Sequence, residues 1–222
     1  KENPFDLQTA LHYAQPGQVI IMMDGTYAPD RDYVIGRNVN GREDAMITLM
    51  AENTGKAVIS GSNNASSSSL LSIVGSYWHV FGLEVTDGIA KGISVCGNNN
   101  IVEMCVIHNV GNSGLQISRN GGEYNDAKMW PSNNLIKNCD AYDCCDTARN
   151  DADGFAAKLT CGEGNAFYGC ISHNNIDDGW DLYAKSTTGP IGAVTIENCV
   201  AYSNGFLTTD DPTDPGDDDV ED

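Results

Sequence analysis

The segments Ala152-Asp153-Gly154-Phe155 and Asp177-Asp178-Gly179-Trp180-Asp181 decide the fold, because they repeat nearly the same phrase at an interval of 25 residues. Aligning their Asp-Gly-aromatic triplets places Asp153 on Asp178. A repeat of about 25 residues is too short for a folded domain and is typical of one turn of a solenoid. When such turns stack as parallel strands, aligned residues lie about 4.8 Å apart. The two segments therefore predict neighbouring turns with their aspartates side by side.

Four aspartates would meet in one small patch if these two turns stack, namely Asp153, Asp177, Asp178 and Asp181. Carboxylates that close repel one another unless a positive group lies between them. Ca2+ suits such a patch, because it accepts several carboxylate oxygens in a flexible geometry. We therefore predict a Ca2+ site with these four aspartates as ligands.

The repeat extends along the chain from residue 92. Each unit has a glycine, alternating apolar residues, a polar turn and a strand with Asn and Cys, and an insertion at residues 120–131 lengthens one unit. Short apolar strands with Gly and Asn turns and no long helical period predict an all-β fold, a right-handed single-stranded parallel β-helix. We assign residues 1–207 to this domain and residues 208–222 to an acidic loop or disordered tail. Because no cap is evident, we expect the solenoid to be incomplete at both ends.

Strand alternation sorts the aligned side chains into an inner and an outer set. The inner set forms two columns that we expect in the core: Ile93, Leu115, Phe155, Trp180 and Phe206, then Val95, Ile117, Ala157 and Leu182. The outer set is expected to line a polar groove: Ser94, Gln116, Ala156 and Asp181, then Ser118, Lys158 and Tyr183. Before the regular repeats, helical spacing predicts a helix over residues 5–15. Short strands are expected over residues 19–23, 46–50, 57–59 and 77–85.

Four of the eight cysteines recur in one context at spacings of 34, 31 and 29 residues: Cys105, Cys139, Cys170 and Cys199. We expect an inward column of reduced cysteines, since free Cys packs well as a small buried hydrophobe. The chain has no CxxC pair, which argues against a zinc site. His108 and His173 each follow a column cysteine by three residues. We interpret them as stacked structural side chains rather than a general acid or base.

The net charge limits which macromolecules the protein is expected to bind. Twelve Lys plus Arg against 31 Asp plus Glu give a net charge of −19. Nucleic acid and anionic membranes are poor partners for such a chain, because both need basic clusters. No apolar run reaches the ~20 residues of a membrane span. An acidic polysaccharide is compatible with this charge only if a cation bridges the two.

Two segments carry a resemblance to a known family: Asp151-Ala152-Asp153-Gly154-Phe155-Ala156-Ala157-Lys158 and Asn175-Ile176-Asp177-Asp178-Gly179-Trp180-Asp181-Leu182. With the stretch from Ile107 to Ile117, they resemble polysaccharide lyase family nine, which contains pectate lyases with a parallel β-helix fold. The resemblance covers residues 4–206 and implies that the four aspartates hold a catalytic Ca2+. The family's general base is a later lysine in a Gly-Phe-Lys context. Here Gly205-Phe206 is followed by Leu207, so that lysine has no match at this position.

The resemblance implies a Ca2+-dependent pectate lyase that cleaves polygalacturonate, or a related uronate polymer, by β-elimination. Two alternatives remain open. One is a β-helix glycoside hydrolase of the polygalacturonase type with Asp153, Asp177 and Asp178 as acid and base. The other is a non-catalytic carbohydrate-binding β-helix fragment that lacks the catalytic lysine. An acidic plant cell-wall polysaccharide as partner implies a secreted, extracellular protein, which we expect to be a monomer.

Four further residues are candidates for the site. Lys158 is the candidate base, because desolvation or a nearby cation lowers a lysine pKa enough for proton transfer; a salt-bridged groove residue is the alternative. Gln116 and Tyr183 are expected to face the groove and contact the substrate. Trp130, in the insertion, is a candidate for stacking on a sugar ring.

Overall fold

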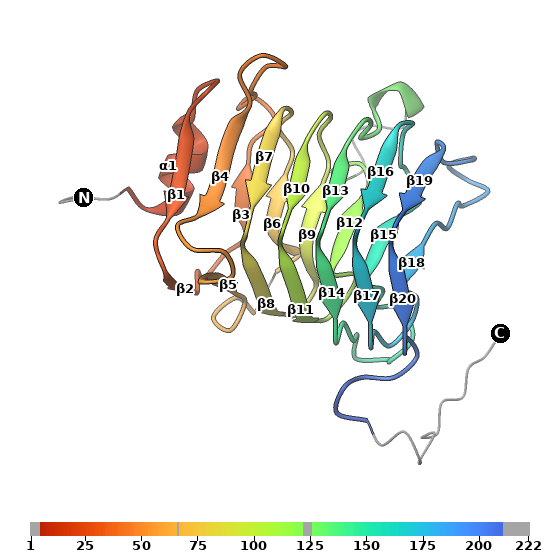
Figure 1. Cartoon of the computed structure of the whole chain (residues 1–222). Helices are drawn as coiled ribbons and strands as arrows, with labels where there is room; N and C mark the ends of the chain where they lie inside the picture. The colour runs from red at the N-terminus through yellow and green to blue at the C-terminus, as the bar shows by residue number, and fades with distance from the viewer. Residues whose placement is uncertain (1–4, 66, 122–125, 211–222) are drawn as a thin grey trace.

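Parallel strands wind through three sheets in the computed structural model, which describes residues 5–65, 67–121 and 126–210 (Figure 1). Each turn adds one strand to each of the three sheets, except that the last described turn adds none to the third sheet, so neighbours within a sheet come from successive turns. Every strand pair among the named strands is parallel, as the sequence repeat predicts. The predicted parallel β-helix is confirmed.

The sheets are named A, B and C here. Sheet A contains β1 (Val19–Met22), β4 (Ile47–Ala51), β7 (Trp78–Phe81), β10 (Ile101–Glu103), β13 (Leu135–Lys137), β16 (Asn165–Tyr168) and β19 (Val194–Glu197). Sheet B contains β2 (Gly25–Tyr27), β5 (Ala57–Ser60), β8 (Glu84–Gly88), β11 (Val106–Val110), β14 (Asp140–Tyr142), β17 (Ile171–His173) and β20 (Val200–Tyr202). Sheet C contains β3 (Tyr33–Ile35), β6 (Ser69–Ile73), β9 (Lys91–Val95), β12 (Leu115–Ile117), β15 (Phe155–Ala157) and β18 (Trp180–Asp181).

The register of sheet C matches the predicted columns. Leu115 pairs with Ile93 on one side and Phe155 on the other, and Phe155 pairs with Trp180. The side chains of the first three are fully buried, and Trp180 is partly buried and stacks on Phe155 with ring centroids 5.2 Å apart. The second column is buried at Val95, Ile117 and Ala157. Such burial contributes roughly 1.5–3 kcal/mol per large side chain.

Two members of the predicted columns are not in the core. Leu182 is 42% exposed and Phe206 is 38% exposed. Strand β18 ends at Asp181, so Leu182 lies beyond the last residue of the strand. Phe206 lies in a turn after β20 rather than in a strand. Within the described residues, no further strand of sheet C covers either side chain, which is why the alternation rule failed there.

The first turns differ slightly from the sequence prediction. Helix α1 spans Leu7–Tyr13 and begins at Asp6, whose side chain accepts a hydrogen bond from the Thr9 backbone, a standard N-cap. It packs against β1 and β3 at the N-terminal end of the stack (Figure 1). The strand predicted over residues 77–85 is two strands, β7 and β8. Gly82 separates them because its φ of +71° turns the chain between sheets A and B.

The Asn-Cys motif is explained by the corner between sheets A and B. One residue in each of these corners has a left-handed backbone: Met104, Asn138, Gly169 and Asn198. Glycine and asparagine tolerate this conformation best. The next residue is in each case a cysteine of the predicted column, and the column is buried from Cys105 to Cys170 and half-buried at Cys199. All eight cysteines are free, as expected for the four that form the column.

A ladder of buried asparagines supports sheet A. Asn100 donates its backbone N–H to Asn134 Oδ1 at 3.0 Å, and Asn134 donates its own to Asn165 Oδ1 at 3.0 Å. The Asn134 amide also donates to the carbonyl of Gly97 at 3.0 Å. Each side chain therefore satisfies backbone groups of the turn beside it, where a buried unpaired group would cost about 1–3 kcal/mol.

Most of the predicted tail and part of the insertion lie outside the described residues. Of residues 208–222, only 208–210 are described, and they are held by contacts: Thr208 Oγ1 donates to Asp143 Oδ2 at 2.6 Å, and Arg149 pairs with Asp210 at 2.8 Å. The insertion contains a short 3-10 helix, η1 (Ala127–Met129). No helix in the described part of the chain has the length and apolarity to cross a bilayer.

Candidate metal centre

The aspartates of the repeated phrase flank two adjacent strands of sheet C. Asp153 lies two residues before β15, and Asp177 and Asp178 lie just before β18, which ends at Asp181. The glycine after each Asp is favoured by the close approach of side chains from sheet B and from the turn after β20. A Cβ on Gly154 would lie 1.9 Å from Ser172 Oγ, and one on Gly179 would lie 2.9 Å from the Asn204 amide. The Asp-Gly repeat thus combines a carboxylate with a tight corner.

Lys158 is drawn into the aspartate cluster. Its Nζ lies 2.9 Å from Asp153 Oδ2 and 2.6 Å from Asp181 Oδ2, and 3.8 Å from Asp151 Oδ1. Ser113 Oγ donates to the same Asp153 oxygen at 2.7 Å. Burial by itself lowers the pKa of Lys158, but the hydrogen bonds from its ammonium to Asp181 and Asp153 outweigh burial and raise that pKa. Lys158 is therefore a buried cation in this arrangement.

The carboxylates lie close enough together to raise one another's pKa. Burial, followed by the charges of Asp153 and Asp178, raises the pKa of Asp177 to about 6. Burial and the charge of Asp181 raise the pKa of Asp178. Burial also raises the pKa of Asp153, although its contacts with Lys158 and Ser113 oppose this. A single ammonium does not neutralise this group of acids.

The residues present fit a bound cation in their chemistry. Asp153 is fully buried, and its Oδ1 has no hydrogen-bond partner. A buried carboxylate oxygen without a partner is costly, and a hard cation would satisfy it. Within the described residues, no three carboxylate, thiol or imidazole groups already converge as a ligand set. The Lys158 ammonium instead holds two of the predicted ligands, Asp153 and Asp181.

The predicted substrate-contacting residues lie in different environments. Tyr183 is 55% exposed beside the cluster, and its backbone N–H donates to Asp181 Oδ1 at 2.7 Å. Gln116 faces outward from sheet C but is only 6% exposed, and its amide donates to Ser118 Oγ at 2.9 Å. Trp130 is 4% exposed, so it offers no open ring face to a sugar. Strand alternation gives the direction of a side chain but not what the neighbouring turns and loops place over it.

Sequence reasoning missed two residues at the cluster. Ser113 is fully buried and bonded to Asp153. It precedes Gly114 as Asp153 precedes Gly154, so the glycine alignment contained a signal for it. Asp151 is exposed and lies within ion-pair distance of Lys158, and no repeat marks it.

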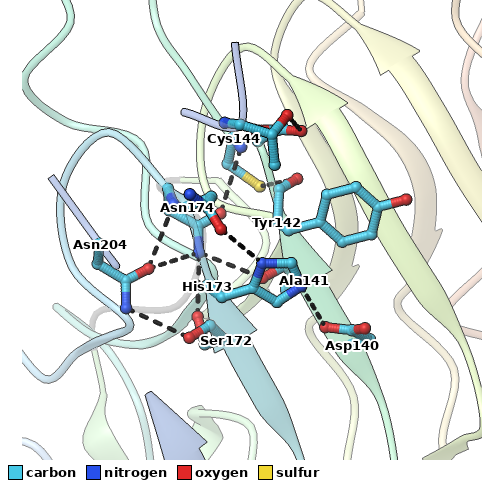
Figure 2. A network of polar contacts seen from close by, with 11 residues as sticks. Asp140, Ala141, Tyr142, Cys144, Ser172, His173, Asn174 and Asn204 are labelled. Atoms are coloured by element: carbon cyan, nitrogen blue, oxygen red, sulfur yellow. Dashed lines mark hydrogen bonds and ion pairs between the residues drawn. The ribbon is translucent and has the colours of Figure 1, made fainter. Parts of the chain in front are cut away.

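The two histidines belong to a ring stack on the outer face of sheet B. His108, Tyr142, His173 and Tyr202 stack with ring centroids 4.8, 5.0 and 4.8 Å apart. Figure 2 shows the His173 ring between Asp140 and Asn174, with Nε2 3.5 Å from Asp140 Oδ1 and Nδ1 2.9 Å from Asn174 Oδ1. The predicted stacking is confirmed, with Tyr142 between the two histidines, and it lies on a different sheet from the aspartates.

Fold and site together define a class: a parallel β-helix in which carboxylates of successive turns gather at one edge of one sheet. A family model described as a Pel9A-like right-handed β-helix region matches residues 1–218. The chain belongs to this Pel9A-like β-helix family. The match also gives the handedness that the sequence predicts.

Known relatives agree with the family. The chain is 46% identical over 210 residues to a pectate lyase L of Thermoclostridium stercorarium, covering 94% of this chain and 17% of the relative. It is 43% identical to a pectate lyase L of Paenibacillus polymyxa, covering 90% of this chain and 45% of the relative. The crystal structure of pectate lyase Pel9A superimposes with a TM-score of 0.77 at 32% identity, covering 96% of this chain and 52% of that one. The chain therefore spans about half the length of these relatives or less.

Proposed function

We propose that this chain is the β-helix part of a Ca2+-dependent pectate lyase that cleaves polygalacturonate, or a related uronate polymer, by β-elimination. The relatives named pectate lyase support the reaction class. The observation that supports a metal site is the environment of Asp153. This carboxylate is fully buried, has one unpartnered oxygen, and lies among the acids of two adjacent turns. Asp153, Asp177, Asp178 and Asp181 are the proposed ligands. The polymer is a plant cell-wall component, so we propose a secreted protein that acts as a monomer.

The proposed reaction divides between the cation and the side chains. Asp153, Asp177, Asp178 and Asp181 would hold Ca2+, whose positive charge would make the C5 proton of a bound uronate more acidic. Lys158 is the candidate base that this chain places in the site. It can accept a proton only after it leaves Asp153 and Asp181, because these contacts raise its pKa. Tyr183, exposed beside Asp181, is available to contact the polymer.

The test is the ultraviolet absorbance of polygalacturonate incubated with the protein, first with Ca2+ and then with excess chelator. A lyase produces an unsaturated uronate whose absorbance grows only while Ca2+ is present. Asp177→Asn should lose this signal, whereas Asp44→Asn, an exposed acid paired with Arg42 far from the cluster in sequence, should keep it.

Two outcomes would contradict the proposal. New reducing ends without an unsaturated product would indicate a hydrolase. Binding of polygalacturonate without any product, with and without Ca2+, would indicate the non-catalytic carbohydrate-binding alternative.

A further inference from the structure

Lys91 is a cation without a partner among the described residues, and it belongs to sheet C, the sheet that carries the aspartates. It is the first residue of β9 in sheet C and is half-buried. Among the described residues, its ammonium makes no hydrogen bond or ion pair, and burial lowers the pKa of Lys91. The chain has 31 acidic residues against 12 basic ones, so an unpaired lysine here is unusual. A partly desolvated charge without a counter-ion is costly unless something else provides one.

The acids nearest to Lys91 are already engaged. Asp32 accepts hydrogen bonds from the side chains of Asn64 and Ser67 at 2.8 and 2.7 Å, and from Ser68 and Ser69. Asp151 lies beside Lys158. These carboxylates contribute only longer-range attraction to Lys91.

The remaining neighbours do not supply a counter-ion either. The Cys96 thiol is neutral, because burial raises its pKa to about 11. Ser69, the strand partner of Lys91, donates its hydroxyl to the Leu71 carbonyl at 3.1 Å. Ser113, on the other side, donates to Asp153. Among the described residues around Lys91, none therefore supplies the anion that would pair with it.

The register places Lys91 in line with the aspartate cluster. Ile93 pairs with Leu115, which pairs with Phe155, so the residues two positions earlier form one row: Lys91, Ser113 and Asp153. Lys91 stands two strands from Asp153, about 10 Å along the sheet. Ser113 and Asp153 are buried in this row, whereas Lys91 is partly exposed and lies close enough to Lys158 and Asp151 to feel their charges. A polymer held at the aspartates and extending across the strands of sheet C would bring a neighbouring carboxylate toward Lys91.

We propose that Lys91 binds a carboxylate of the uronate chain at a subsite next to the sugar that the aspartates hold. This assignment rests on the proposed function, since it needs a polyuronate as ligand. Lys91 is a binding residue: its ammonium gains a counter-ion that the described residues do not supply, and the polymer gains a direct contact that does not pass through Ca2+.

The test compares Lys91→Met with Lys91→Arg and with Lys56→Met, which removes an exposed lysine just before β5. Binding of trigalacturonate in Ca2+ is measured by calorimetry. Lys91→Met should weaken binding about tenfold or more, the usual loss for a charge-assisted hydrogen bond. Lys91→Arg and Lys56→Met should bind within about threefold of the unaltered protein. The thermal midpoint of Lys91→Met should not fall, because an unpaired charge has been removed.

The outcomes separate the two proposals. If the unaltered protein fails to bind trigalacturonate, the proposed function fails and Lys91 loses its ligand. If the unaltered protein and Lys91→Met bind equally, only the role of Lys91 is overturned. A fall in thermal midpoint that accompanies the weaker binding would make Lys91 a structural residue and would also overturn the assignment.

Discussion

The effect of the neighbouring carboxylates is most directly measurable at Asp177. Its pKa is raised to about 6 from a reference value of 3.8, so the folded chain holds this proton more tightly than the unfolded chain does. A raised carboxyl pKa contributes stability below pH 4 that is lost as the pH rises to about 6. In excess chelator, we expect the unfolding free energy of the unaltered protein to decline over this window relative to Asp177→Asn. The relative decline should be about 1–2 kcal/mol after solvent screening. Urea unfolding at pH 4, 5, 6 and 7 measures it, and parallel curves for the two proteins would contradict it.

Lys158 can act as the base or as a counter-ion to the aspartates. Activity and stability, measured on one variant, test the two roles separately. As the base, its loss should lower the rate of product formation by about 100-fold or more while trigalacturonate binding is retained. As a counter-ion alone, its loss should leave Asp153 buried without its ion pair and should destabilise the metal-free protein by about 3 kcal/mol. We expect Lys158→Ala to show both effects, and Ca2+ to restore the stability but not the activity. Full lyase activity in Lys158→Ala would exclude it as the base.

At the scale of the element, the asparagine ladder makes each turn depend on the next. Replacing Asn134 by Ala removes the acceptor for the Asn100 N–H and the donor to the Gly97 carbonyl, and both groups stay buried. We expect a loss of about 3 kcal/mol in the free energy of unfolding, from two unsatisfied groups at about 1–3 kcal/mol each. Asn63→Ala is the control, because that amide makes an exposed bond to the Ala28 carbonyl. Urea unfolding compares them, and equal losses would show that the ladder adds no stability.

The elements also show why the sequence predicts some features and not others. The register of Ile93, Leu115 and Phe155 follows from a strict period of two, and the Asp-Gly repeat identifies which strands are neighbours. Alternation does not report how far a long side chain bends back, so the sequence allowed a salt-bridged Lys158 as an alternative but did not identify Asp153 and Asp181 as its partners. It also does not report what covers an outward residue, and Gln116 is buried for that reason. The insertion lies outside the repeat, so the spacing of the repeat could not predict that Trp130 is buried.

For the whole molecule, the strongest constraint is the net charge of −19. Four of the carboxylates lie at the edge of sheet C, on the two turns joined by β15 and β18. A cation bound there would tie these turns together and would remove repulsion at the same time. Because each turn of a solenoid contacts only its neighbours, stability gained at one joint adds to the whole stack.

Ca2+ should therefore stabilise the folded chain in a saturable way. At a hundredfold excess over the dissociation constant, linkage gives about 2.7 kcal/mol, a rise of about 5–10 °C in the thermal midpoint for a chain of this size. Asp178→Asn should reduce the rise, whereas Asp44→Asn should keep it. Mg2+ should raise the thermal midpoint less than Ca2+ does, because it requires a smaller and more regular ligand shell than these aspartates offer. Scanning calorimetry with Ca2+, Mg2+ and chelator makes the comparison. An equal rise with both metals, or an undiminished rise in Asp178→Asn, would place the cation on the general acidic surface instead of at the aspartate cluster.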